Sequence, residues 1–137
     1  MKKIEVVAAI IEKKNQFLAT QRGYGEFKGM WEFPGGKVEP GENKQDALLR
    51  EIEEELNVNI LIKQYLCTVD YQYPTFHLTM HCYICKIDQG DIILNEHLAA
   101  KWLIADELNQ LEWLPADIDV VKQLENYARN NKLADGE

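Results

Sequence analysis

Three glutamates on one predicted helix are the residues of this chain best suited to chemistry. Glu51, Glu54 and Glu55 are spaced so that, at 100° per residue, their side chains project within an arc of about 100°. Crowded carboxylates at the edge of a core repel one another unless a cation lies among them. Their oxygens suit Mg²⁺, or alternatively Mn²⁺. An isolated E-x-x-E-E is more often a solvated helix face, so the case for a metal site depends on the residues around these glutamates.

The glutamates stand in a fixed context of glycine, glutamate and arginine. Gly36 is followed after five residues by Glu42, and after seven more by R-E-I-E-E-E-L-N-V, which begins at Arg50. This resembles the Nudix box, G-x5-E-x7-R-E-U-x-E-E-x-G-U with U apolar. Every fixed position matches except the second glycine, here Asn57. Since Asn tolerates the left-handed backbone better than other side chains, the departure leaves the turn possible.

The resemblance to the Nudix family covers nearly the whole chain. The segments 4–11, 31–39 and 114–118 look like the MutT branch, which sanitises nucleotide pools and has close cousins that hydrolyse cytosine nucleotides. The implied fold is α+β, an α/β/α sandwich with a mixed sheet and a catalytic loop-helix-loop. One domain is expected over 1–137, with a frayed tail at 130–137. The implied reaction is attack of water on a nucleoside triphosphate, which releases a nucleoside monophosphate and pyrophosphate.

By the same resemblance, the box supplies the metal ligands and the base. The three box glutamates correspond to metal ligands, joined by the carbonyl of Gly35, where glycine lets the backbone approach an ion. Glu96, six residues before Trp102, matches a further family glutamate that is either a ligand or the general base. Glu51 is the other candidate for the base. Arg50 is expected to orient Glu51 by a charge-assisted hydrogen bond.

Other positions match substrate-binding residues of the MutT branch. Arg22 and Lys37 are placed to meet phosphate oxygens, although single basic residues in an acidic protein are more often solvated charges. Glu42 is expected to brace the loop from behind the ligands. The remaining positions assigned to the substrate are Glu32, Phe33, Pro34, Phe76 and Asp117.

Two of these positions depart from MutT and bear on the choice of base. Phe76 stands where MutT has an arginine, and Asp117 stands where MutT has an asparagine facing the oxidised guanine. An amide donates and accepts, whereas an ionised aspartate only accepts. Asp117 is therefore expected to favour N–H edges of 8-oxoguanine or the N4 amino group of cytosine. The first hypothesis is 8-oxo-dGTP, with (d)CTP or 5-methyl-dCTP as the alternative; Asp117 is also a suitable cap for the last helix.

Composition limits the partners. The 137 residues carry a formal net charge of −8, which repels DNA, RNA and anionic membranes, so the expected partner is a small nucleoside triphosphate. No segment reaches the ~20 apolar residues of a membrane span, and the amino terminus lacks the layout of a signal peptide, which favours the cytoplasm. The sequence leaves monomer and homodimer open. A non-catalytic Nudix ligand-binding module is the alternative from another class, and the complete box argues against it.

A zinc site is the competing interpretation for the cysteines. Cys82 and Cys85 form C-x-x-C, with His77 and His81 upstream. Strand alternation over 76–87 sends the two thiols to opposite faces. Because structural zinc needs four converging ligands, we expect reduced strand cysteines instead.

The elements that position these residues follow from apolar patterning. Predicted strands lie at 4–11, 17–20, 31–33, 58–71, 76–87 and 101–103. Pro34 to Gly36 should halt the third of them. The box helix is expected from the N-cap Asn43 to Leu56, with Asp46 in the capping-box position. A helical turn is expected near 106–108 and a last helix over 116–129.

Overall fold

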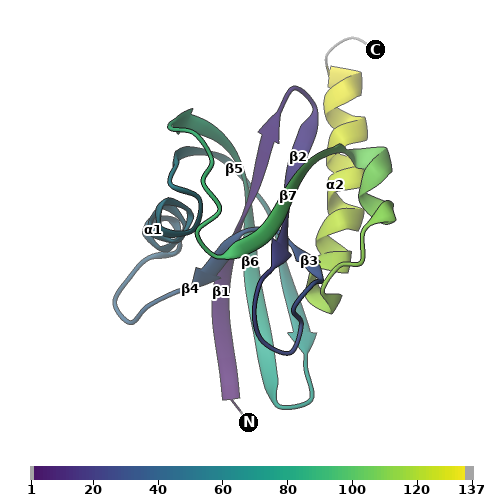
Figure 1. Cartoon of the computed structure of the whole chain (residues 1–137). Coiled ribbons are helices and arrows are strands. Elements are labelled where there is room, and N and C mark those ends of the chain that lie inside the picture. Colours follow the sequence, from purple (N-terminus) through teal and green to yellow (C-terminus); the bar gives the residue numbers. More distant parts are fainter. Residues whose placement is uncertain (1, 135–137) are drawn as a thin grey trace.

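A mixed sheet of seven strands organises the chain, and the computed structural model describes residues 2–134 (Figure 1). The elements in chain order are β1 (Lys2–Lys13), β2 (Gln16–Arg22), β3 (Trp31–Glu32), β4 (Gly35–Lys37), α1 (Lys44–Leu56), β5 (Asn59–Gln72), β6 (Phe76–Gln89), β7 (His97–Ile104), the 3-10 helix η1 (Ala105–Gln110) and α2 (Pro115–Ala134). Helices α1 and α2 cover opposite faces of the sheet, so the predicted α+β sandwich is confirmed.

Strand β1 is shared by two branches of the sheet. It pairs in parallel with β6, which also pairs with β5, and it takes the short β4 on its other side. Only Glu12 and Lys13 continue the ladder into β2, which pairs further along with β7 and β3. The turn residues Lys14 and Asn15 have φ of 51° and 64°, as a tight right-twisted hairpin requires. Away from this hairpin, the β1–β6–β5 part of the sheet and the β2–β7–β3 part are not paired with each other.

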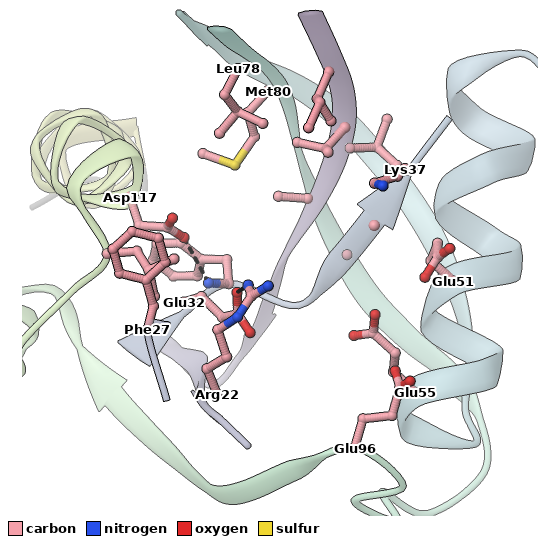
Figure 2. Close-up of a pocket in the computed structure, with 18 of the residues that line it drawn as sticks. Arg22, Phe27, Glu32, Lys37, Glu51, Glu55, Leu78, Met80, Glu96 and Asp117 are labelled. Carbon is pink, nitrogen blue, oxygen red and sulfur yellow. Dashed lines mark hydrogen bonds and ion pairs between the residues drawn. The ribbon is translucent and has the colours of Figure 1, made fainter. Parts of the chain in front are cut away.

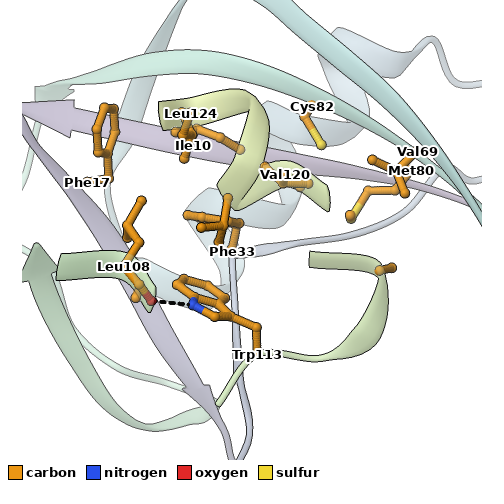
Figure 3. Close-up of a cluster of buried hydrophobic side chains, with 14 of the residues drawn as sticks. Ile10, Phe17, Phe33, Val69, Met80, Cys82, Leu108, Trp113, Val120 and Leu124 are labelled. Carbon is orange, nitrogen blue, oxygen red and sulfur yellow. Dashed lines mark hydrogen bonds between the residues drawn. The ribbon is translucent and has the colours of Figure 1, made fainter. Parts of the chain in front are cut away.

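The apolar run of β1 is buried on both faces. Val7, Ala9 and Ile11 pack with the residues of α1. Ala8 and Ile10 pack on the other face with the residues of α2, in the cluster drawn in Figure 3. A strand covered on both faces has a continuous apolar sequence rather than an alternating one. Both helices therefore rest on the same strand from opposite sides.

Helix α1 begins and ends where its sequence predicts. The Asn43 side chain accepts a 2.8 Å hydrogen bond from the backbone N–H of Asp46 and donates to the Asp46 carboxylate. At the other end Asn57 adopts the left-handed conformation, with φ 60°. The substitution of Asn for the box glycine is thus accommodated by the backbone.

Strand β6 confirms the predicted alternation. Met80, Cys82 and Ile84 belong to the core cluster on the α2 side, whereas Tyr83 and Cys85 belong to the cluster on the α1 side. The thiols of the C-x-x-C motif point to opposite faces of the sheet and do not converge on one ion.

Most boundaries lie within two residues of the sequence prediction, and three differences are larger. Residues 35–37 form β4 rather than only halting a strand, because a glycine backbone can lie close against β1. Strand β7 starts at His97 rather than at 101. Helix α2 continues past 129 to Ala134, and the rest of the predicted frayed tail, 135–137, lies outside the described residues. Within the described part of the chain, neither helix combines the length and apolarity needed to cross a membrane.

Candidate active site

A cavity of about 510 Å³ lies between the α1 and α2 sides of the molecule (Figure 2). Its volume is typical of pockets for small organic ligands. Its acidic end lies beside α1, and its other end lies beside the start of α2, with Asp117 and apolar side chains. The predicted site residues that line it are Arg22, Glu32, Phe33, Gly35, Lys37, Glu51, Glu55, Phe76, Glu96 and Asp117.

Glu55 is buried at the acidic end. Its side chain is 9% exposed, and its Oε1 atom has no hydrogen-bond partner among the described residues. Burial, followed by the negative charges of Glu51 and Glu96, raises the pKa of Glu55 to about 9. Such a carboxyl holds a proton at neutral pH unless a cation takes the place of that proton. The acidic end is therefore short of positive charge.

Arg50 supports the box glutamates from outside the cavity. Its Nη1 donates to Glu51 Oε1 at 2.8 Å, which confirms the predicted contact. Its Nε and Nη2 both donate to the Glu42 carboxylate at 2.8 Å, and Nη2 also donates to the Lys37 carbonyl. The Arg50 bonds and a bond from the Glu39 N–H lower the pKa of Glu42 to about 2. This bidentate contact fastens the loop that carries Glu42 to helix α1, as expected for a residue that braces the loop.

Two glycines of β4 make contacts that leave no room for a side chain. A Cβ atom on Gly35 would lie 1.9 Å from the Val7 carbonyl oxygen, so this glycine lets β4 approach β1. A Cβ atom on Gly36 would lie 2.3 Å from both the carboxyl carbon and Oε2 of Glu51. The Glu51 carboxylate therefore occupies the space that a side chain at position 36 would fill.

Replacement of Gly36 by Ala should lower kcat about 10- to 100-fold, because the new methyl group displaces the Glu51 carboxylate. The thermal midpoint, measured alongside, separates misplacement from unfolding. Combining Gly36→Ala with Glu51→Asp gives a double-mutant cycle, since the shorter acid relieves the contact. We expect Gly36→Ala to cause a smaller loss when it is added to the Glu51→Asp variant than when it is added to the wild type. Equal losses in both backgrounds would contradict the steric explanation.

The acidic end offers carboxylate oxygens of the kind that bind divalent cations. None of the described residues is a hydrogen-bond partner of the buried Glu55 Oε1, and Arg50 binds one oxygen of Glu51. Among the described residues, no three Asp, Glu, His or Cys side chains already converge as ligands of one ion. Hard cations such as Mg²⁺ keep several waters and take only a few carboxylates together with substrate phosphates. The residues present fit an ion of this kind.

Asp117 lies buried at the opposite end of the cavity. Its Oδ2 atom accepts a 2.9 Å hydrogen bond from the Phe33 N–H, on a different element from its own helix. Burial, together with the negative charge of Glu32, raises the pKa of Asp117 to about 8. With a pKa near 8 the carboxyl is mostly protonated at pH 7 and carries a donor, which differs from the expectation of an ionised Asp117 that only accepts.

Aromatic and apolar side chains form the wall beside Asp117. The ring of Tyr73 lies 5.5 Å from that of Phe27 and stacks on Phe76 at 4.8 Å between centroids. Leu78 and Met80 of β6 continue the same wall (Figure 2). Flat ring surface and apolar side chains suit the face of a nucleobase. Phe76, which the family match assigned to substrate binding, belongs to this wall.

Three predicted residues do not line the cavity: Pro34, Arg50 and Glu54. The Glu54 side chain is 60% exposed, and its Oε2 lies 3.5 Å from Arg50 Nη1. Phe33 does line the cavity, but its ring stacks on Trp113 at 4.6 Å in the core. The backbone of Phe33, through the bond to the helix carboxyl, is its contribution to the site.

His97 is the site neighbour that sequence reasoning missed. Its side chain is 5% exposed, with Nε2 3.5 Å from Glu32 Oε2 and 3.8 Å from Glu55 Oε1. Glu32 in turn accepts a 2.8 Å hydrogen bond from Arg22. In the sequence, only the position of His97 directly after Glu96 could have pointed to its place beside the site. Arg22 and Glu32, which were expected to act separately, are thus linked through His97 to Glu55.

Comparison with known proteins gives consistent matches. The NUDIX domain family model matches residues 1–124. The chain is similar to the CTP pyrophosphohydrolase of Escherichia coli (strain K12), with 37% identity over 89% of this chain and 91% of the relative. It is also similar to the 8-oxo-dGTP diphosphatase of the same organism, with 27% identity over 90% and 98%. The crystal structure of a MutT NUDIX hydrolase from Burkholderia pseudomallei superposes with a TM-score of 0.82 at 27% identity, covering 90% and 99% of the chains.

Proposed function

The chain belongs to the NUDIX domain family and is a nucleoside triphosphate pyrophosphohydrolase, and from that premise we propose that it cleaves 8-oxo-dGTP to 8-oxo-dGMP and pyrophosphate. The proposal rests on the neutral carboxyl of Asp117 at the base end of the cavity. Because Oδ2 accepts from the Phe33 N–H, Oδ1 carries the proton and donates. The O6 atom of 8-oxoguanine is an acceptor for it. In this arrangement the protonated Asp117 donates to the base, as the asparagine amide at the matching position of MutT can.

The acidic end would hold the metal and the triphosphate. We assign Mg²⁺, with Mn²⁺ as a substitute, to a donor set of Glu51, Glu54, Glu55, Glu96 and the Gly35 carbonyl. A bound ion polarises phosphoryl oxygens and lowers the pKa of the attacking water. Glu54 would turn inward from its exposed position to join the set.

The remaining groups of the cavity position the substrate. Lys37 reaches toward the phosphates, and Glu51, fixed by Arg50, accepts the proton of the attacking water or shares that role with Glu96. Arg22 is held by Glu32 beside the base end. Water attacks one phosphorus of the α–β anhydride, and the oxygen that bridges the two phosphorus atoms leaves on the other with the electron pair of the broken bond, so that 8-oxo-dGMP and pyrophosphate are released. Because the proposed substrate belongs to the cellular nucleotide pool, we propose that the enzyme acts in the cytoplasm.

The second candidate substrate is (d)CTP or 5-methyl-dCTP. The 37% identity to a CTP pyrophosphohydrolase favours it. Pyrophosphate release from 8-oxo-dGTP, dGTP, dCTP and 5-methyl-dCTP decides between the two. We expect the highest kcat/KM for 8-oxo-dGTP, and a higher value for either cytosine nucleotide would reject the first choice.

Asp117 variants test how the base is read. Asp117→Asn should keep the KM for 8-oxo-dGTP within about threefold at pH 7, since an amide accepts from the Phe33 N–H and donates to the base, as the neutral acid does. Asp117→Leu removes both bonds and should raise this KM about tenfold or more. Asp119→Asn, an exposed change on the same helix, is the matched control. An unchanged KM in folded Asp117→Leu contradicts base contact.

The alternative of a non-catalytic binding module is tested by the same assay. A binding module would retain a nucleotide without releasing pyrophosphate at any Mg²⁺ concentration. Isothermal titration with a non-hydrolysable triphosphate, run beside the turnover assay, distinguishes binding from catalysis.

A further inference from the structure

Two of the three cysteines lie directly opposite each other on neighbouring strands. Cys67 of β5 pairs in register with Cys82 of β6, next to an irregularity in β5 between Tyr65 and Cys67. Both side chains lie on the α2 side of the sheet: Cys82 is fully buried in that core cluster (Figure 3), and Cys67 packs against it. Opposite residues in antiparallel strands have Cα atoms ~4.5–5.5 Å apart, within the range that a disulfide spans.

We propose that Cys67 and Cys82 are a redox modification site, at which a hydroperoxide converts the two thiols into a reversible intrachain disulfide. The proposal does not depend on the substrate. Nothing in the nucleotide chemistry of the cavity uses either sulfur. In a reducing compartment the pair is normally dithiol, as cysteines of cytosolic redox sensors are.

The two thiols differ in the way this reaction needs. Cys67 is half-buried, so an oxidant reaches it, whereas Cys82 is not exposed. A hydrogen bond from the Cys82 thiol to the Cys67 sulfur lowers the pKa of Cys67, and this effect outweighs the opposing effects of burial and of the negative charge of Asp119. The same bond, together with burial, raises the pKa of Cys82. Cys67 is therefore the thiolate that attacks, and Cys82 is the thiol that resolves.

The reaction balances in two steps. The Cys67 thiolate attacks the terminal oxygen of the hydroperoxide, the O–O bond breaks, and an alcohol or water leaves with a proton, giving a sulfenic acid. The Cys82 sulfur then attacks the sulfenic sulfur, its proton goes to the departing hydroxyl, and water is released. Two thiols are oxidised, and one peroxide is reduced.

Cys85 supplies an internal control. It is fully buried on the opposite face of the sheet, in the cluster beneath α1. Burial raises its pKa to about 12, so it is a thiol at any working pH. It has neither the access nor the neighbour that the reaction needs.

Intact-mass and peptide mass spectrometry test the site. The full chain at micromolar concentration is treated with hydrogen peroxide at increasing molar ratio, quenched with an alkylating agent, and digested without reductant. We expect a monomeric species lighter by two hydrogens, with the residue-67 and residue-82 peptides linked and Cys85 alkylated after denaturation. Dithiothreitol should restore three free thiols.

Variants assign the roles within the pair. Cys85→Ser should form the link at the wild-type rate. Cys67→Ser should react at least tenfold more slowly, and Cys82→Ser should stop at the sulfenic acid, which a dimedone probe captures. A link that involves Cys85, a disulfide between two chains, or oxidation without a linked peptide in the wild-type protein would each overturn the proposal. The peptide map of the wild-type protein decides the proposal by itself, so the outcome does not depend on whether every variant folds.

Discussion

Replacement of Glu51 by Gln should lower kcat by about 10²- to 10⁴-fold, the range typical of a lost general base. Glu51 lines the cavity, is 15% exposed and is fixed by Arg50. Glutamine keeps its size but loses both the charge for a cation and the capacity to accept a proton. The measurement is pyrophosphate release at saturating Mg²⁺ and saturating 8-oxo-dGTP.

Glu53→Gln is the matched control for Glu51. It makes the same chemical change on the same helix, at an exposed side chain that does not line the cavity. We expect its kcat to stay within about twofold of wild type. A pH–rate profile of Glu96→Gln assigns the base: the variant that lacks the base loses the acidic limb of the profile. Comparable activity of Glu51→Gln and Glu53→Gln would remove Glu51 from the mechanism.

Glu55→Gln should abolish turnover and yet stabilise the metal-free protein by several kcal/mol near pH 8, at about 1.4 kcal/mol for each pH unit above 4.5. The folded carboxyl has a pKa of about 9 against an ordinary value of 4.5. Between these values the unfolded chain releases this proton and the folded chain keeps it, so the wild type loses stability as pH rises from about 4.5 to 9. Glutamine has no proton to lose, and the variant should escape that part of the decline.

Thermal midpoints at pH 4 and pH 8, with and without Mg²⁺, measure both effects of Glu55→Gln. The midpoints of variant and wild type should coincide at pH 4 and diverge at pH 8 without the ion. Added Mg²⁺ should raise the midpoint of the wild type and of Glu53→Gln, since binding to the folded state stabilises it. An equal rise in Glu55→Gln would show that Glu55 does not contact the ion.

The box and its helix could be predicted from sequence because they are local. Helix caps and helical spacing lie within one element or its flanks, so the sequence pattern placed them correctly. The Arg50–Glu51 contact, which the family resemblance implied, is equally local. Residues of the base end were named because they match family positions. Their surroundings were not predictable, since the bond from Phe33 to Asp117 joins residues 84 apart in sequence.

The properties that depend on burial were out of reach of the sequence. An Asp is ordinarily ionised at neutral pH, and it is burial, together with the negative charge of Glu32, that raises the pKa of Asp117. His97 likewise gave no periodic signal, because its importance comes from the approach of Glu32 and Glu55 from two other elements. Residues 35–37 look like a chain break by composition, yet the same glycines permit pairing with β1.

Strand β1 gives the middle of the cavity a firm wall. Ile4, Val6, Val7 and Ala8 line the cavity from one continuous strand, and helices α1 and α2 cover the two faces of that strand. The part of the cavity between the acidic end and the base wall is therefore lined by a central strand of the sheet rather than by a loop. Core strands open least readily in a folded protein, so we expect this wall to keep its shape when a nucleotide binds.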